Sequence, residues 1–218
     1  MHYELEKVQV IDSCNILLKY DENNKDIYTN KYFKVLFNNG ISIINDFLKL
    51  NNMKNIIVKI EPKERSFDGY CGWQDFNTNI VHIIIEKCAR INLMYSYPNF
   101  TSNRTPQGVL IHEFGHLITA PKYRPWNGSN KTIKDKVKEK CISSYAPNAN
   151  EWVAEQLKLF ITNPDLLKIL RPKTYNEFSK YWKPLNRGSY KEVLKYPLGY
   201  IPERIEKRLK TKLDKNII

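Results

Sequence analysis

Residues 105–119 read TPQGVLIHEFGHLIT, and this stretch decides how the rest of the chain is interpreted. Thr105 followed by Pro106 is typical of a helix start, with Thr as the N-cap and Pro in the first helical position. Pro121 predicts that the helix ends near Thr119. Apolar side chains occupy most positions in between. The sequence therefore predicts a largely buried helix that carries two histidines.

The two histidines have the spacing of a metal site. His112 and His116 are four residues apart, so both imidazoles leave the same helix face, and both could reach one zinc ion at about 2.0–2.1 Å. Glu113 follows roughly 100° further round, where it could accept a proton from a metal-bound water, as in the H-E-x-x-H motif. The alternative is a surface helix with two incidental histidines. The apolar neighbours argue against it, because half-buried imidazoles need partners.

A catalytic zinc needs three protein ligands and one open position for water. The other two of the four histidines, His2 and His82, come earlier and show no helical pairing. Downstream, Glu151 and Glu155 lie four apart on an expected helix that opens near Asn148. Glu151 also fits a capping box with Asn148 as the N-cap. The residues alone leave both interpretations of Glu151 open.

Residues 143–155, SSYAPNANEWVAE, resemble the second signature of the gluzincin metallopeptidases. The resemblance is to the catalytic domain of anthrax lethal factor and to related phage-encoded and bacterial zinc peptidases, and it covers roughly residues 105–178. It implies that Glu151 is the third zinc ligand and that Tyr145 donates a hydrogen bond to the oxyanion. It also implies that Glu155 orients a ligand histidine. The interval from Tyr145 to Glu151 is one residue shorter than in lethal factor.

The N-terminal half predicts a mixed architecture. An apolar periodicity over residues 33–48 indicates a helix, and residues 56–60 and 80–85 are β-branched runs typical of strands. A polar turn with Gly69 and Gly72 is expected between the two strands. The second strand directly precedes the histidine helix, so we expect it to be an edge strand to which an extended peptide could add. The alternative is a core strand.

The C-terminal half predicts mainly helices. After a long lysine-rich connection at 131–140, helices should open near Asn148, at Pro164, and at Thr174, where an acid three residues later completes a capping-box spacing. A basic amphipathic helix over 203–213 closes the chain. We expect an α+β, zincin-like fold in one domain over 1–218, with a small mixed or antiparallel sheet packed on the zinc-site helix.

Charge is unevenly distributed. The 218 residues carry a net charge of +12, and residues 171–218 hold 13 Lys and Arg against 5 Asp and Glu, a net of +8. This basic region could meet nucleic acid or an anionic surface. A solvated lysine-rich helix face is the simpler interpretation, because aromatics are not interleaved as a base-stacking platform requires.

Three functions follow from these patterns. The favoured one is a zinc-dependent endopeptidase acting on a protein or peptide, with Glu113 as general base. The alternatives are a regulatory metalloprotease that cleaves a repressor, and a non-catalytic protein that binds zinc or nucleic acid. Glu113 separates peptidase from binder, because a binder does not need an acid beside a metal-bound water.

The remaining features bear on location and packing. The four cysteines are scattered, which favours free, mostly buried thiols. The start of the chain does not resemble a signal peptide, and the apolar run at 80–85 is too short to span a bilayer. We expect a cytoplasmic protein without a membrane span, and secretion by a non-classical route stays open. Trp73, Trp126 and Trp152 could line a substrate cleft, although core packing is the commoner role.

Overall fold

The computed structural model describes residues 8–10, 16–19, 31–62, 70–88, 104–143 and 145–186. The chain divides into two compact units. The first comprises Met1–Arg90 and Arg104–Arg124, and the second Ile91–Asn103 and Pro125–Ile218. Strands and helices are both present, so the predicted α+β class is confirmed. The expectation of a single domain over 1–218 stays a prediction.

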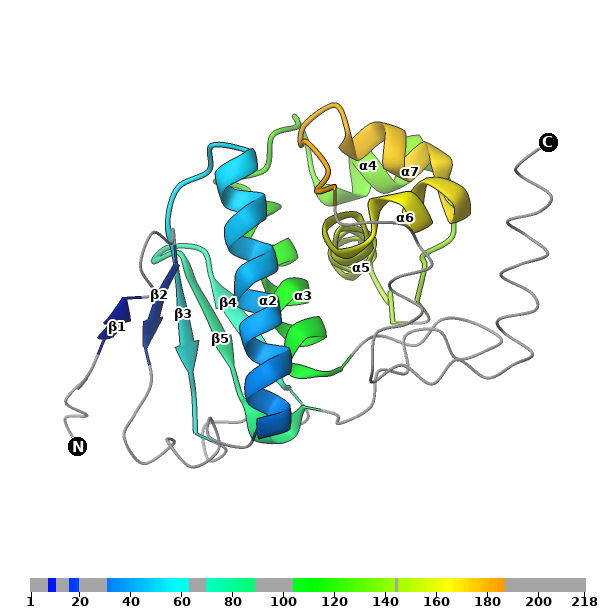
Figure 1. The fold of residues 1–218 in the computed structure, drawn as a ribbon. Helices are drawn as coiled ribbons and strands as arrows, with labels where there is room; N and C mark the ends of the chain where they lie inside the picture. Colours follow the sequence, from blue (N-terminus) through cyan, green and yellow to red (C-terminus); the bar gives the residue numbers. More distant parts are fainter. Residues whose placement is uncertain are drawn as a thin grey trace, which may run out of the picture. The chain divides into compact units, whose positions relative to one another are not determined.

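The first unit contains a five-stranded mixed sheet with the order β1-β2-β3-β5-β4. Strands β2, β3 and β5 are parallel to one another, whereas β1 and β4 run antiparallel to their neighbours at the two ends. In the order in which they lie side by side (Figure 1), the strands are β1 (Val8–Val10), β2 (Ile16–Lys19), β3 (Ile56–Ile60), β5 (Ile80–Ile83) and β4 (Gly72–Asp75).

Two helices complete the described part of this unit. Helix α3 (Pro106–Ile118) contacts β4 and β5, and helix α2 (Lys31–Leu50) contacts α3. Alternate residues of β3 and β5 are buried, as expected for a sheet that packs one face against helices. The core between the helices includes an edge-to-face contact of Phe47 with Phe114, whose ring centroids are 6.1 Å apart.

Two expectations for this unit are wrong. The strand expected at 80–85 ends at Ile83 and is followed by the 3₁₀ turn η3 (Ile85–Lys87), and β5 lies between β3 and β4 instead of at the edge. Among the described strands, the edge next to α3 is β4, which falls in the segment expected to be a polar turn. Its sequence, GWQD, has no β-branched residue. Pairing with β5 through a tight turn makes it a strand, and Asp75, the last residue of β4, accepts hydrogen bonds from Asn77 and Thr78 in that turn.

The described part of the second unit is helical. Its helices are α4 (Asn130–Val137), α5 (Ala149–Thr162), α6 (Pro164–Leu170) and α7 (Pro172–Phe178). Helix α5 contacts the other three and is buried without interruption from Trp152 to Ile161. The predicted openings of α5 and α6 are confirmed. The Asn148 side chain accepts from the N–H groups of Asn150 and Glu151, and the Asn163 side chain accepts from Leu166 N–H.

Two further expectations are corrected in the second unit. The lysine-rich segment is not a simple connection, because α4 forms there with a capping box between Ser129 and Thr132. Helix α7 begins at Pro172, so Thr174 is not its N-cap. The Glu139 carboxylate takes that role and accepts from both the N–H and the hydroxyl of Thr174 at 2.8 Å. The helix expected over 203–213 lies outside the described residues.

Several smaller expectations can also be compared. Cys71, Cys88 and Cys141 are free thiols, and Cys14 lies outside the described residues. Trp126 and Trp152 are buried, whereas Trp73 is half-exposed, and a role of these residues in lining a cleft stays a prediction. No helix in the described ranges is long and apolar enough to cross a membrane.

We predict that Glu139→Ala lowers the free energy of unfolding by about 1–2 kcal/mol, the usual cost of losing a helix cap. The Glu139 carboxylate accepts three hydrogen bonds at the start of α7, two from Thr174 and one from Lys173 N–H at 3.2 Å. Denaturant unfolding followed by circular dichroism measures the loss. Lys173→Ala is the control, because it removes an exposed side chain and keeps the backbone donor. Equal stability of the two variants would show that the cap does not matter.

Candidate metal centre

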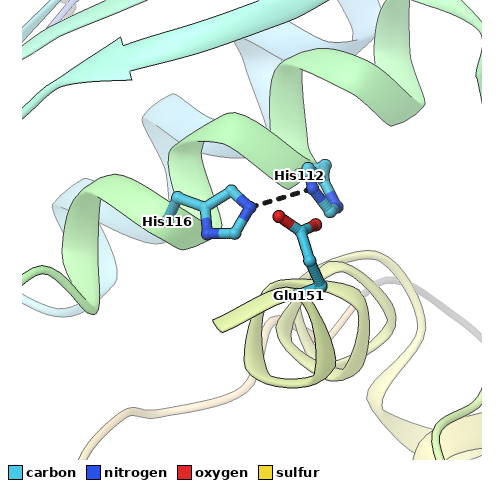
Figure 2. A group of neighbouring side chains, drawn as sticks. All are labelled: His112, His116 and Glu151. Atoms are coloured by element: carbon cyan, nitrogen blue, oxygen red, sulfur yellow. Dashed lines mark hydrogen bonds between the residues drawn. The ribbon is translucent and has the colours of Figure 1, made fainter. Parts of the chain in front are cut away.

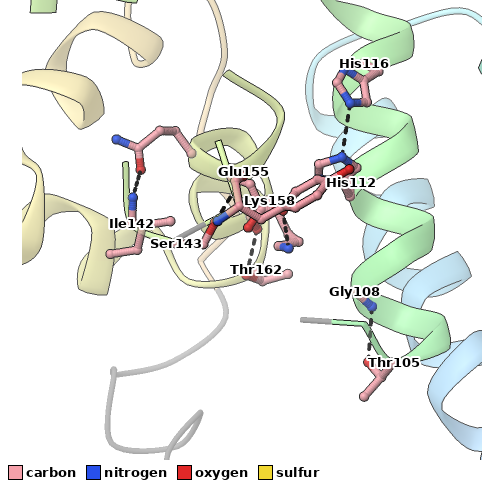
Figure 3. Close-up of polar contacts among 11 residues, drawn as sticks. Thr105, Gly108, His112, His116, Ile142, Ser143, Glu155, Lys158 and Thr162 are labelled. Carbon is pink, nitrogen blue, oxygen red and sulfur yellow. Dashed lines mark hydrogen bonds and ion pairs between the residues drawn. The ribbon is translucent and has the colours of Figure 1, made fainter. Parts of the chain in front are cut away.

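Helix α3 is fixed at both ends by its own sequence. At the start, Thr105 Oγ1 accepts from Gly108 N–H at 3.2 Å, with Pro106 in the first turn (Figure 3), as the sequence predicted. At the end, Thr119 Oγ1 donates to the Gly115 carbonyl at 2.8 Å. Apolar side chains around the helix are buried, among them Val109, Leu110, Ile111, Phe114, Leu117 and Ile118. The helix therefore holds its polar side chains in defined directions.

The two histidines of α3 lie against each other (Figure 2). The Nε2 atoms of His112 and His116 are 3.0 Å apart, and the rings are nearly perpendicular, at 84°. His112 is buried and His116 is half-buried. A contact between two ring nitrogens requires one to donate a proton and the other to accept it with its lone pair. The prediction that both imidazoles leave one face is confirmed.

This spacing fits a shared metal ion. Two imidazole nitrogens bound at about 2.0–2.1 Å to one tetrahedral zinc lie roughly 3.3 Å apart. The observed 3.0 Å separation of His112 Nε2 and His116 Nε2 differs from that value by only a few tenths of an ångström. The two nitrogens therefore lie at nearly the same separation whether they share a proton or bind one zinc ion. The donor set and its spacing fit zinc.

Glu113 follows His112 and is half-buried. Backbone of β4 approaches it closely at Gly72. A Cβ atom added at Gly72 would lie 3.0 Å from Glu113 Cγ, 3.0 Å from Val109 Cγ1 and 2.8 Å from the His82 carbonyl oxygen. Only glycine allows this approach of strand to helix. Apart from the glycine itself, no sequence signal pointed to this contact, since the segment was expected to be a turn.

Glu151 lies in the first turn of α5 and is half-buried. Its backbone N–H donates to the Asn148 side chain at 3.0 Å, which confirms one half of the predicted capping box. This bond uses the main chain of Glu151, so an N-cap at Asn148 and a metal ligand at Glu151 are compatible. His112 and His116 belong to the first unit and Glu151 to the second, and a carboxylate is one of the groups that can complete a zinc site begun by two imidazoles.

The two other predicted residues belong to the second unit. Glu155 is fully buried on α5 and forms an ion pair with Lys158, whose role the sequence reasoning missed (Figure 3). A lysine three residues after an acid in an apolar helix was the available signal. Tyr145 has 47% of its surface exposed, and its backbone N–H donates to Ser143 Oγ at 3.2 Å. The catalytic role of Tyr145 stays a prediction.

His82 has partners of its own on the sheet. Its Nδ1 lies 2.7 Å from Glu61 Oε1, and its ring stacks on Trp73 with centroids 4.6 Å apart. Burial would raise the pKa of the Glu61 carboxyl, but the hydrogen bonds and charges of His82 and Lys59 outweigh it, and the net shift is downward. These contacts give the half-buried His82 side chain two partners of its own.

No protein-family model, curated protein or solved structure matches this chain. The interpretation of the centre therefore depends on its own residues.

We predict that Gly72→Ala lowers the free energy of unfolding by about 1–3 kcal/mol, the usual cost of overpacking. The added methyl group meets the His82 carbonyl, which cannot turn aside without breaking the pairing of β4 with β5. Thermal unfolding measures the loss.

Gly40→Ala is the matched control. Its methyl group also presses on α3, 3.1 Å from Leu110 Cδ2, but alanine in a helix recovers about 1 kcal/mol relative to glycine. We therefore expect a smaller loss, and a loss in Gly40→Ala equal to or greater than that in Gly72→Ala would contradict the argument.

Proposed function

We propose that this chain is a zinc-dependent peptidase in which His112, His116 and Glu151 ligate zinc and Glu113 is the general base. The observation that carries the proposal is the 3.0 Å approach of two Nε2 atoms on a buried helix, with a half-buried acid between the two histidines in sequence. The resemblance of residues 143–155 to the gluzincin signature supports the choice of Glu151.

The number of candidate ligands favours a catalytic over a structural site. Structural zinc sites are usually closed by four protein ligands, whereas catalytic sites use three and leave one position for water. The proposed set has three members, His112, His116 and Glu151. Such a set has room for water, and Glu113 is the acid available to act on it.

The protein residues then have distinct tasks in hydrolysis. When bound, zinc lowers the pKa of a water ligand toward about 7 and polarises the scissile carbonyl. Glu113 accepts a proton from the water as it attacks and passes that proton to the leaving amine. The Tyr145 hydroxyl donates a hydrogen bond to the oxyanion, and its exposed ring is accessible to a substrate. Glu155 accepts a hydrogen bond from a ligand imidazole and fixes its orientation.

The substrate proposed is a peptide in extended conformation, added to the sheet as a further strand on β4. Among the described strands β4 pairs only with β5, so its other edge offers backbone donors and acceptors. The close approach of Gly72 to Glu113, where a Cβ atom added to the glycine would lie 3.0 Å from Glu113 Cγ, supports this choice, because it brings the edge strand against the helix turn that carries the proposed general base.

The proposed ligands make a prediction about metal content. The purified full chain should hold about one zinc, and His112→Ala, His116→Ala or Glu151→Ala should lose it, because two remaining ligands rarely retain the ion. Glu155→Ala should bind about 10–100-fold more weakly, as expected for a supporting residue. Atomic emission spectroscopy measures the zinc content, and competitive titration with a chromophoric chelator measures the zinc affinity.

Lack of stoichiometric metal in the wild-type chain would contradict the proposed zinc site and the peptidase function that depends on it. If Glu155→Ala loses zinc while Glu151→Ala keeps it, the two roles are reversed.

The proposed base makes a prediction about activity. Glu113→Gln should retain zinc but cleave peptides about 10²–10⁴-fold more slowly, because an amide cannot accept the water's proton. A peptide-library cleavage assay read by mass spectrometry measures this. Glu86→Gln, an exposed acid on η3, is the matched control and should keep full activity. Near-normal cleavage by Glu113→Gln excludes Glu113 as the base, and zinc binding without any wild-type cleavage favours the non-catalytic alternative.

A further inference from the structure

Two cysteines of the first unit lie at the same turn of the chain. Cys71 directly precedes β4, and Cys88 is the C-cap of η3. The Cys71 thiol donates to the Lys87 carbonyl at 3.3 Å, and the Cys88 thiol donates to the Ile84 carbonyl at 3.5 Å. The Ile84 N–H in turn donates to the Cys71 carbonyl at 2.8 Å. Both thiols are therefore bound to the same short segment of backbone.

These contacts limit how far apart the two cysteines can lie. In a trans peptide, the carbonyl oxygen of one residue is about 2.8 Å from the Cα atom of the next. Because Cys71 Sγ is 3.3 Å from the Lys87 oxygen, it lies within about 6 Å of Cys88 Cα. Disulfides form between residues whose Cα atoms are about 4.4–6.8 Å apart. Rotation of the two side chains with a modest adjustment of the backbone is then enough to join the sulfurs.

The two thiols have different surroundings. The Arg104 guanidinium donates to Cys71 Sγ at 3.4 Å. A neighbouring cation is typical of reactive cysteines, because it favours the nucleophilic thiolate. Burial raises the pKa of the Cys88 thiol well above its usual value, the nearby Cys71 raises it further, and Arg104 lowers it. Cys88 therefore stays protonated, and Cys71 is the sulfur in contact with the cation.

Core packing alone does not account for this arrangement. Cysteine behaves as a small apolar residue in cores, and the exposed fractions of 8% for Cys71 and 7% for Cys88 suit that role. An apolar side chain, however, would fill the same space without a guanidinium against it. Arg104 is an exposed residue, so its contact with the sulfur indicates that Cys71 lies near the surface, within reach of a small oxidant.

We propose that Cys71 and Cys88 are a redox-active dithiol that a hydroperoxide converts into a disulfide, with Cys71 reacting first. The Cys71 thiolate attacks one oxygen of the hydroperoxide. An S–O bond forms, the O–O bond breaks, and the leaving oxygen takes up the thiol proton as water or an alcohol. The Cys88 sulfur then attacks the sulfenic acid, so that an S–S bond forms, the S–O bond breaks, and hydroxide leaves with the Cys88 proton as water.

The electrons balance, because the two thiols lose two electrons and the hydroperoxide gains two. A thiol reductant reverses the change by thiol–disulfide exchange. This dithiol does not require a metal at His112 and His116.

The test treats the reduced full chain with hydrogen peroxide and maps its cysteines by mass spectrometry without reduction. We expect a pair of peptides linked through Cys71 and Cys88. The midpoint of thermal unfolding should also rise, because the bridge closes a loop that includes β4 and β5. Dithiothreitol should reverse both changes. A disulfide that joins any other pair of cysteines, or oxidation that yields no disulfide, overturns the proposal.

Single substitutions test the order of reaction. Cys88→Ser should stop the reaction at a sulfenic acid on Cys71, which dimedone labels, whereas Cys71→Ser should leave Cys88 unlabelled. Arg104→Gln should form the disulfide about tenfold more slowly than the wild type, and Arg104→Lys, which keeps the charge, should be faster than Arg104→Gln. Sulfenic acid trapped on Cys88 instead of Cys71, or an unchanged rate in Arg104→Gln, overturns the assignment of Cys71 as the first thiol to react.

Cys141 is the internal control. It belongs to the second unit, and burial raises the pKa of its thiol to about 11, so it should stay reduced while Cys71 and Cys88 react. Oxidation of Cys141 at the same rate as Cys71 would show that the peroxide reacts with cysteines indiscriminately, and would overturn the proposal.

Discussion

The burial of α3 is the constraint on which the candidate centre depends. The helix is enclosed by apolar side chains on most of its surface, so it cannot rotate to move a polar group into water without exposing part of the core. Its two imidazoles satisfy each other across 3.0 Å. Glycines in two other elements permit the close packing: Gly40 of α2 meets the helix near Leu110, and Gly72 of β4 meets it near Glu113. Both the core and the histidine pair therefore require the same rotation of α3 about its axis.

Elements with local signals could be predicted from the sequence, and elements made by distant contacts could not. Thr105 with Pro106, Asn148, and Asn163 with Pro164 each satisfy the first N–H groups of a helix from within a few residues, so the starts of α3, α5 and α6 were visible. Helix α7 is different, because its cap is the carboxylate of Glu139, more than thirty residues earlier in sequence. Strand β4 likewise has little intrinsic strand preference, since Trp73 is its one strand-favouring residue, and it forms through its pairing with β5.

The residues of the candidate site also fall into those with a local sequence signal and those whose importance depends on distant contacts. The histidine pair was predictable because a spacing of four residues fixes direction on any helix. Glu151 was ambiguous, and the structure shows that the two interpretations do not compete: Asn148 caps the helix through the main-chain N–H of Glu151, and the carboxylate is not used in that bond. Gly72 and Lys158 could not be assigned from sequence, because the importance of each depends on how deeply it is buried against another group.

The acidic residues in the described part of the chain differ in how deeply they are buried, and this difference bears on the proposed hydrolysis. Glu61, Glu155 and Glu177 are buried, and each is paired with a cation: Glu61 with Lys59, Glu155 with Lys158, and Glu177 with Lys136 and Lys180. Glu113 and Glu151, the acids proposed to meet water and zinc, are only half-buried. A buried carboxylate that already holds an ammonium group has little capacity to change partner, since separating the pair leaves the carboxylate unsolvated. A half-buried carboxylate can exchange a water for an ion or a proton at lower cost. The fully buried acids are therefore suited to fixing structure, and the half-buried acids are suited to the proposed reaction.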